Sequence, residues 1–159
     1  NSMLISKRNG SYFFIGELIT DIELEYDKPM GGNYCGDCSR CMDACPTQAI
    51  TELRVVDANK CISYLTIENK DAIPEEFKGS YSKWIFGCDI CQQVCPWNQY
   101  STPHSEPAFI PDPSLLIMQK QDWENMDEES YRQLFKKSAV KRAKFAGLKR
   151  NIRFLSDPE

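Results

Sequence analysis

The chain has 159 residues and a net charge of −4 at pH 7, and 42% of its residues are hydrophobic. It contains no run of 18 apolar residues, which disfavours a membrane-spanning helix, and no secretion-signal pattern at its start. All eight cysteines lie between positions 35 and 95 rather than across the chain, so a disulfide framework is disfavoured and we expect a cytoplasmic location.

The first 33 residues are expected to contain strands followed by a turn. Residues 11–20 are rich in β-branched and aromatic side chains, which predicts a mostly buried strand. Acidic and apolar residues alternate over 21–26, a pattern typical of an edge strand or an extended segment, and residues 28–33 are typical of a turn or linker. Because the first residues are typical of the middle of a protein, we expect a fragment of a longer chain.

Short elements are expected throughout the cysteine-rich region, residues 34–98. Pro46 should end the first of its helices, Asp57 can cap the second, and Pro74 suits the first turn of the third. The predicted elements are helices over residues 39–44, 57–69, 74–80 and 89–94, and a strand over residues 52–56.

The region after residue 100 is expected to be irregular at first and then helical. Four prolines interrupt residues 101–114, whereas apolar residues recur at helical spacing over 127–142. A second helix is expected to begin near Ala146 and to be cut off at Glu159. His104 lies among the prolines and is interpreted as a surface residue, and the three tryptophans (Trp84, Trp97 and Trp123) are interpreted as packing residues.

The cysteines form two related motifs. The first is Cys35-x2-Cys38-x2-Cys41-x3-Cys45-Pro46, and the second is Cys88-x2-Cys91-x3-Cys95-Pro96, with Cys61 upstream of it. This is the spacing of bacterial ferredoxins, in which three cysteines ligate one [4Fe–4S] cluster and the fourth ligates the other cluster. The spacing therefore predicts two quartets: Cys35, Cys38, Cys41 and Cys95 for one cluster, and Cys45, Cys61, Cys88 and Cys91 for the other.

Two other uses of these cysteines are less compatible with the spacing. Structural zinc sites also use pairs of Cys-x2-Cys units, but they seldom use three cysteines at successive two-residue gaps followed by Cys-Pro. Structural disulfides are the second alternative. Two cysteines in a Cys-x2-Cys unit would form a local redox pair, which does not crosslink distant parts of the chain.

The residues around the cysteines resemble one family, the epoxyqueuosine reductases. The resemblance is carried by residues 45–50 (CPTQAI), 57–68 (DANKCISYLTIE) and 87–98 (GCDICQQVCPWN), and it extends to residues 12–18 and 149–153. It implies a cobalamin-dependent enzyme that reduces epoxyqueuosine to queuosine in the anticodon loop of tRNA, with electrons from an external donor passing through the two clusters. It also implies that the proton donor lies upstream of this chain, so no residue here is assigned that role.

The resemblance further implies a domain order and an α+β fold. Residues 1–30 would be the tail of a cobalamin-binding domain, and residues 31–100 a ferredoxin-like 2[4Fe–4S] module of short helices and strands. Residues 101–159 would be a proline-rich wrap followed by the start of a helical-repeat region.

Two groups of residues are candidates for further contacts. The resemblance implies that cobalamin lies against Ser63, Cys88 and Asp89; alternatively, Ser63 and Asp89 only form hydrogen bonds within their short helices. Residues 131–155 contain nine Lys or Arg and no acidic residue, which usually indicates a solvated helix face but also suits contact with RNA phosphates. The candidates for tRNA contact are Lys141, Arg142, Lys144 and Arg150.

Other functions remain open from the sequence. The main alternative is an electron-transfer ferredoxin domain that serves another reductase, such as a dehalogenase-like cobalamin enzyme, although those enzymes lack the string at residues 62–68. A third alternative is a purely structural, RNA-binding metal module.

Overall fold

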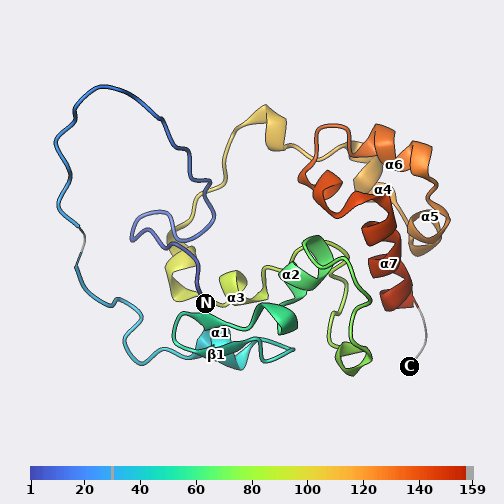
Figure 1. The fold of residues 1–159 in the computed structure, drawn as a ribbon, viewed down its shortest axis with the longest axis horizontal. Helices are drawn as coiled ribbons and strands as arrows, with labels where there is room; N and C mark the ends of the chain where they lie inside the picture. Colours follow the sequence, from blue (N-terminus) through green and yellow to red (C-terminus); the bar gives the residue numbers. More distant parts are fainter. Residues whose placement is uncertain (30, 157–159) are drawn as a thin grey trace.

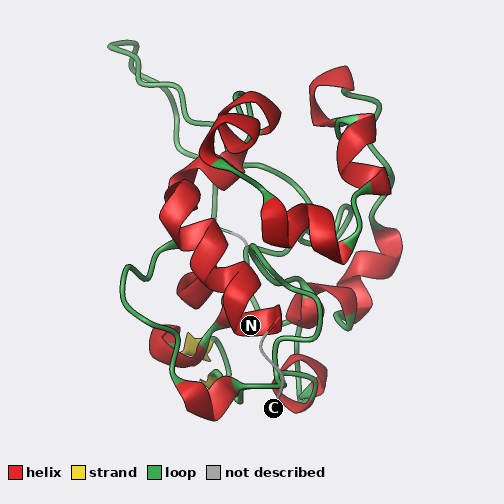
Figure 2. Ribbon diagram, turned by 90° about the vertical axis from the view of Figure 1, so that its right-hand side faces the viewer, coloured by secondary structure: helices red, strands yellow, loops and turns green. Residues whose placement is uncertain are grey.

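The computed structural model describes residues 1–29 and 31–156. Met30 in the expected turn and the expected end of the last helix at Glu159 lie outside these residues. The described chain has three parts: a long N-terminal loop, a central region of short elements, and a C-terminal group of helices (Figure 1). Helices and loops make up most of the fold, and the sheet is a small hairpin (Figure 2).

The central region contains the elements around the cysteines. Its helices are α1 (Arg40–Asp43), α2 (Ile62–Ile67) and α3 (Ile90–Gln93), and its strands are β1 (Ile50–Glu52) and β2 (Val55–Val56). The predictions of short helices over 39–44 and 89–94 are confirmed by α1 and α3. The strand predicted over 52–56 is instead an antiparallel hairpin, because Arg54 adopts a φ of 68° and reverses the chain between β1 and β2.

The helix predicted over 57–69 is divided at Cys61. Asp57 acts as a cap, as expected, but it caps a single 3-10 turn (Ala58–Lys60) by accepting the N–H of Asn59 at 3.0 Å. Cys61 is then extended, with φ −74° and ψ 120°, and α2 begins at the next residue. The break places Cys61 at the start of α2 and not within a helix. The helix predicted over 74–80 is also reduced to one 3-10 turn, Glu75–Phe77.

The buried strand predicted over 11–20 is wrong. None of these residues forms a strand among the described residues, and Leu18 and Ile19 are 95% and 101% exposed. A strand needs the backbone of a neighbour to bond its N–H and C=O groups, and the bridge recorded nearby, Ser6 with Gly10, closes a local turn. Residues 12–29 instead form the exposed loop seen in blue at the left of Figure 1.

The C-terminal region holds four helices within its described part, connected by short turns. They are α4 (Pro113–Ile117), α5 (Lys120–Asn125), α6 (Glu128–Leu134) and α7 (Lys144–Ser156). The sequence prediction missed α4 and α5, and the helix predicted over 127–142 ends at Leu134 and is followed by a 3-10 segment, Ala139–Ala143. The expected second helix is confirmed by α7, which begins at Lys144. Residues 101–112 are irregular except for the 3-10 turn Pro107–Phe109, as the prolines predict.

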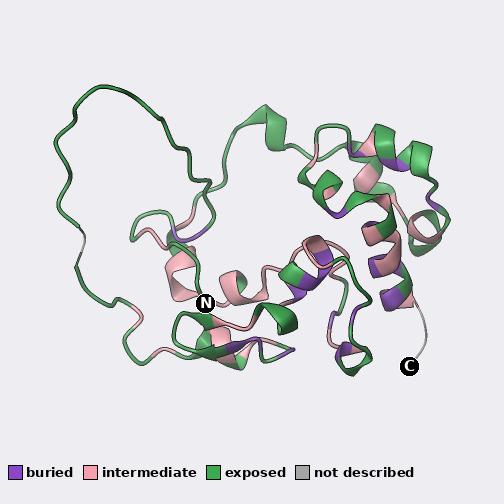
Figure 3. Cartoon of the chain, in the orientation of Figure 1, coloured by how far each residue is buried: buried purple, intermediate pink, exposed green. Residues whose placement is uncertain are grey.

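Helix α7 contributes side chains to both hydrophobic cores. Leu148 and Ile152 belong to the core of the C-terminal helices with Phe135, whereas Phe154 belongs to the other core with Leu65 of α2. Figure 3 shows buried residues along α2 and α7 and an exposed N-terminal loop. The C-terminal helices are therefore packed directly against the cysteine-bearing region. Within the described chain, none of the helices is both long and apolar enough to cross a membrane.

Candidate metal centre

The two cysteine motifs lie next to each other because their short helices are in contact. Helix α1 carries Cys41, helix α3 carries Cys91, and the two helices touch. Each helix lasts about one turn and is followed closely by Pro46 or Pro96, which cannot continue a helix. The same local sequence pattern thus produces the same local structure twice, with the cysteines of the two motifs facing a common region.

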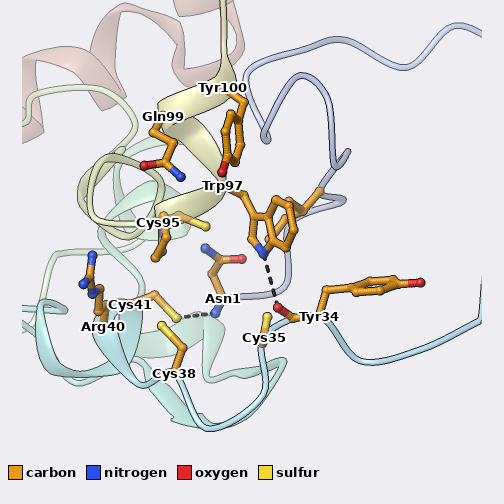
Figure 4. Close-up of a pocket in the computed structure, with 12 residues that line it drawn as sticks. Asn1, Tyr34, Cys35, Cys38, Arg40, Cys41, Cys95, Trp97, Gln99 and Tyr100 are labelled. Carbon is orange, nitrogen blue, oxygen red and sulfur yellow. Dashed lines mark hydrogen bonds between the residues drawn. The ribbon is translucent and has the colours of Figure 1, made fainter.

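One group of four cysteines surrounds a cavity of about 240 Å³. Figure 4 shows the sulfur atoms around this space, with Trp97 beside it and Asn1 among the sulfur atoms, where the N-terminal amine donates to the Cys41 sulfur at 2.8 Å. The Trp97 indole N–H donates to the Tyr34 carbonyl at 3.3 Å, which ties the two motifs together across the cavity. The cysteines of this first cavity are Cys35, Cys38, Cys41 and Cys95.

The other four cysteines line a second, larger cavity of about 680 Å³. The sulfur of Cys45 accepts the N–H of Ala49 at 3.3 Å, so this side chain is already held in place. Ser63 and Asp89 also line the second cavity, and the Asp89 carboxylate accepts a hydrogen bond from Gln92 at 2.5 Å. The cysteines of this cavity are Cys45, Cys61, Cys88 and Cys91.

The distribution of cysteines between the cavities follows the crossed pattern of ferredoxins. Cys95 comes from the second motif but lines the first cavity, and Cys45 comes from the first motif but lines the second. The two groups coincide with the quartets expected from the spacing.

Burial disfavours free thiolates in the second cavity. Burial is the main reason why the pKa of the Cys91 thiol rises to about 11; the charges of Cys88 and Cys61 add to the rise, and the N-terminal ammonium group opposes it. Burial also raises the pKa of Cys88. Iron binds the thiolate, so the ligands of this cavity need a cation to compensate their negative charge.

The donors and dimensions of the two cavities fit iron–sulfur clusters. Within residues 1–29 and 31–156, no group of three or more His, Cys, Asp or Glu side chains is arranged to hold one metal ion. A cubane spreads its ligands over four iron atoms, so its thiolates need not converge on one point as those of zinc do. About 10 to 15 Å³ of such a cavity accommodates one water-sized atom, so eight atoms need at most roughly 120 Å³, and each cavity is large enough.

The four basic residues predicted to contact RNA lie in different environments. Lys141 and Lys144 are exposed, and Arg142 is exposed but forms an ion pair with Glu68. Arg150 is partly buried, and its guanidinium donates to backbone carbonyls of the central region, so its donors are engaged within the protein. The structure therefore does not bring the four predicted residues together as one free basic patch.

Sequence reasoning missed a polar network beside the second motif. The Asn98 side chain accepts the Ser11 N–H at 2.6 Å and donates to the Gln92 carbonyl at 2.6 Å, and Ser11 also donates to the Gln92 side chain at 2.8 Å. Gly10 makes this approach feasible, because a Cβ at that position would lie 2.0 Å from the Asn98 side-chain oxygen. Gly10 and Asn98 are the residues in the sequence that could have indicated this network, but that they lie close together is decided by the tertiary fold.

Comparisons with known proteins agree with this geometry. Residues 34–98 match a family model described as a 4Fe-4S double cluster binding domain. The chain is 56% identical over 155 residues to an epoxyqueuosine reductase of Cellulophaga algicola, which covers 98% of this chain and 50% of that protein. It is 45% identical over 153 residues to an epoxyqueuosine reductase of Synechocystis, which covers 95% of this chain and 53% of that protein. The chain thus spans about half the length of the curated relatives it matches.

Solved structures show the same relationship. The structure of epoxyqueuosine reductase from Bacillus subtilis matches with a TM-score of 0.87 and 31% identity, covering 96% of this chain and 41% of that one. The enzyme from Streptococcus thermophilus matches with a TM-score of 0.81 and 34% identity, covering 97% of this chain and 40% of that one. A further match, with a TM-score of 0.87 and 31% identity over 96% of this chain and 40% of that one, is an epoxyqueuosine reductase crystallised with an epoxyqueuosine-modified tRNA-Tyr stem loop.

Proposed function

Because the chain resembles epoxyqueuosine reductases over nearly its whole length, we propose that it is the iron–sulfur electron-transfer module of such an enzyme. The enzyme would convert epoxyqueuosine to queuosine in tRNA. The observation that carries this proposal is the division of eight cysteines between two cavities within residues 34–98, the region that matches a double-cluster domain. In this proposal residues 31–100 are a ferredoxin-like 2[4Fe–4S] module, residues 1–30 the tail of an upstream domain, and residues 101–159 the start of a helical-repeat region.

The proposed cluster ligands are the cysteines of each cavity. Bound [4Fe–4S] clusters would supply a one-electron relay. The contact between α1 and α3 supports a short distance between the two sites, and the hydrogen bond from Ala49 to the Cys45 sulfur orients one ligand before a cluster binds.

Iron and sulfide quantitation tests the proposed function. We expect roughly eight irons and eight sulfides per chain after anaerobic purification, because two cubanes each contain four of both. Chemical analysis should be combined with EPR of the reduced protein, in which two clusters in proximity give interacting signals. About two zinc ions per chain and no sulfide would contradict the proposal and favour structural zinc sites.

We further propose that the second cavity faces cobalamin. Its volume of about 680 Å³ exceeds what one cluster needs, and Ser63 and Asp89 line it beside Cys88. Cobalamin would supply a cobalt centre that accepts electrons from the relay. Ser63 would leave room for it with a small side chain, whereas the Asp89 carboxylate is oriented by Gln92.

Enlarging Ser63 tests this placement. In the complete enzyme, Ser63→Trp is expected to displace cobalamin and change its absorption spectrum, while the iron content stays at the wild-type value. Ser105→Trp is a matched control, because Ser105 lies in the exposed segment after residue 100. A wild-type cobalamin spectrum and affinity in Ser63→Trp would contradict the proposed contact.

The proposed partner of the C-terminal region is tRNA. The stem-loop complex of a structural neighbour supports an RNA partner, and Lys141 and Lys144 are exposed in the basic segment. Arg142 can add to this contact if its pair with Glu68 opens. Because the donors of Arg150 are bound within the protein, we do not carry Arg150 forward as an RNA contact.

Neutralising the two exposed lysines tests the RNA contact. The double variant Lys141→Gln with Lys144→Gln is expected to lower the slope of log affinity against log salt by about 1.4 to 1.8, since each lost phosphate contact contributes about 0.7 to 0.9. The measurement is tRNA binding by the complete enzyme at several salt concentrations. Lys28→Gln, in the N-terminal loop, is the charge-matched control. An unchanged slope in the double variant would exclude these lysines from the interface.

A further inference from the structure

Asn151 of α7 connects two segments that lead to cysteines of the second cavity. Its side chain is only 1% exposed. The amide nitrogen donates to the Thr66 carbonyl at 2.8 Å and to the Ile85 carbonyl at 2.9 Å. Thr66 lies in α2, which begins directly after Cys61, and Ile85 lies three residues before Cys88. One buried amide therefore holds both segments at a fixed distance from each other.

Arg150 reinforces this connection at the end of α2. Its guanidinium donates to the carbonyls of Leu65, Asn69 and Asp71, each at 2.7 Å. The last carbonyls of a helix have no partner within the helix, and a cation at this end also interacts favourably with the helix dipole. Arg150 also donates to the Asn151 side-chain oxygen at 2.8 and 3.1 Å, which orients the Asn151 amide nitrogen toward its two carbonyls.

A third hydrogen bond connects the same two segments directly. The Thr66 hydroxyl is fully buried; it donates to the Ile62 carbonyl at 2.7 Å and accepts the Gly87 N–H at 3.0 Å. Gly87 directly precedes Cys88 and has a φ of +72°, a conformation that other residues rarely adopt. The backbone that delivers Cys88 is thus fixed against α2.

We propose that Arg150 and Asn151 are positioning residues that set the separation of Cys61 and Cys88 and thereby control the second cluster. The inference rests on the proposed function, because it assumes that the second cavity holds a cluster. The carbonyls bound by the pair lie in residues 65–71 and at Ile85, in segments that carry ligands of the second cavity. The first cluster should therefore not depend on this pair.

Asn151→Asp is the sharpest test, because it changes little in shape. The variant keeps the oxygen that accepts from Arg150 but replaces the donating nitrogen with an oxygen, so the carbonyls of Thr66 and Ile85 lose their donor. The holoprotein is purified anaerobically in two backgrounds: Cys95→Ser, expected to retain the second cluster, and Cys45→Ser, expected to retain the first. Asn151→Asp should lower the iron content several-fold in the Cys95→Ser background and leave it unchanged in the Cys45→Ser background. In otherwise wild-type protein, any second cluster that remains should have a shifted midpoint potential.

Two further variants separate positioning from general destabilisation. Arg150→Lys keeps the charge but not the planar set of donors, so it should cause a smaller loss of iron that is also confined to the second cluster. This variant provides the test if Asn151→Asp does not fold. Arg153→Gln, at an exposed position of the same helix, should change neither cluster. Equal loss of both clusters, or wild-type iron content and potentials in Asn151→Asp and Arg150→Lys, would overturn the inference while leaving the proposed function intact. A wild-type protein without roughly eight irons would overturn both.

Discussion

Replacing Cys95 with Ser is expected to abolish the cluster of the first cavity, although Cys95 belongs to the second sequence motif. The side chain lines the same cavity as Cys35, Cys38 and Cys41. A serine hydroxyl is a much weaker ligand than a thiolate, so the iron content should fall from roughly eight to roughly four per chain. Cys45→Ser should cause an equal loss, but from the second cavity.

Double variants show which cysteines share a cluster. Cys35→Ser with Cys95→Ser should retain the same four irons as either single variant, because both residues line one cavity. Cys35→Ser with Cys45→Ser should remove nearly all iron, because these residues line different cavities although they belong to one motif. If instead the Cys35/Cys95 double variant lost nearly all iron and the Cys35/Cys45 double variant kept one cluster, the fourth ligands would not be exchanged. Both iron analysis and EPR would detect this outcome.

Replacing Phe135 with Ala is expected to destabilise the C-terminal helices by about 4 kcal/mol, a typical cost of removing a large aromatic side chain from a core. Phe135 is 3% exposed, and its ring lies 5.4 Å from that of Tyr131 and 6.4 Å from that of Trp123. Its neighbours in this core come from α5, α6 and α7, so truncation removes contacts among three helices. Urea unfolding of the anaerobic holoprotein, followed by tryptophan fluorescence, measures the change for Phe135→Ala.

Phe109→Ala is the matched control for this prediction. Phe109 is 51% exposed and lies in the irregular segment before α4, so the same truncation should cost less than about 1 kcal/mol. Similar losses for the two variants, or a loss below about 1 kcal/mol for Phe135→Ala, would contradict the assignment of Phe135 to the core.

Local signals in the sequence were sufficient for the helices of the cysteine motifs. Pro46 and Pro96 limit α1 and α3 to one turn each, and this effect needs no information from distant residues. The strand predicted over residues 11–20 failed because strand formation depends on a partner, and partners cannot be read from composition. The break at Cys61 was missed for a related reason: Asp57 identifies a cap, but not how far the capped helix continues.

The predicted RNA contacts in the basic segment also depended on distant residues that the local sequence does not reveal. In the sequence, Lys141, Arg142, Lys144 and Arg150 are equivalent cations. In the structure, Arg142 pairs with Glu68 and Arg150 binds the end of α2, and both interactions join residues more than seventy positions apart. Which of these cations are engaged within the protein is therefore a property of the tertiary fold and not of the segment.

The exposed N-terminal loop is fastened at both ends to the same short stretch of chain. Ser11 is bound to Asn98, and Tyr34 is bound to Trp97, so the chain leaves this stretch after Ser11 and returns to a neighbouring point at Tyr34. The entropy of closing such a loop changes slowly with its length, and doubling the length costs only about 0.6 kcal/mol. Insertion of a peptide tag or a fluorescent domain near the tip of this loop, which extends away from the cysteine region in Figure 1, should thus be tolerated and should leave the cysteine ligands untouched.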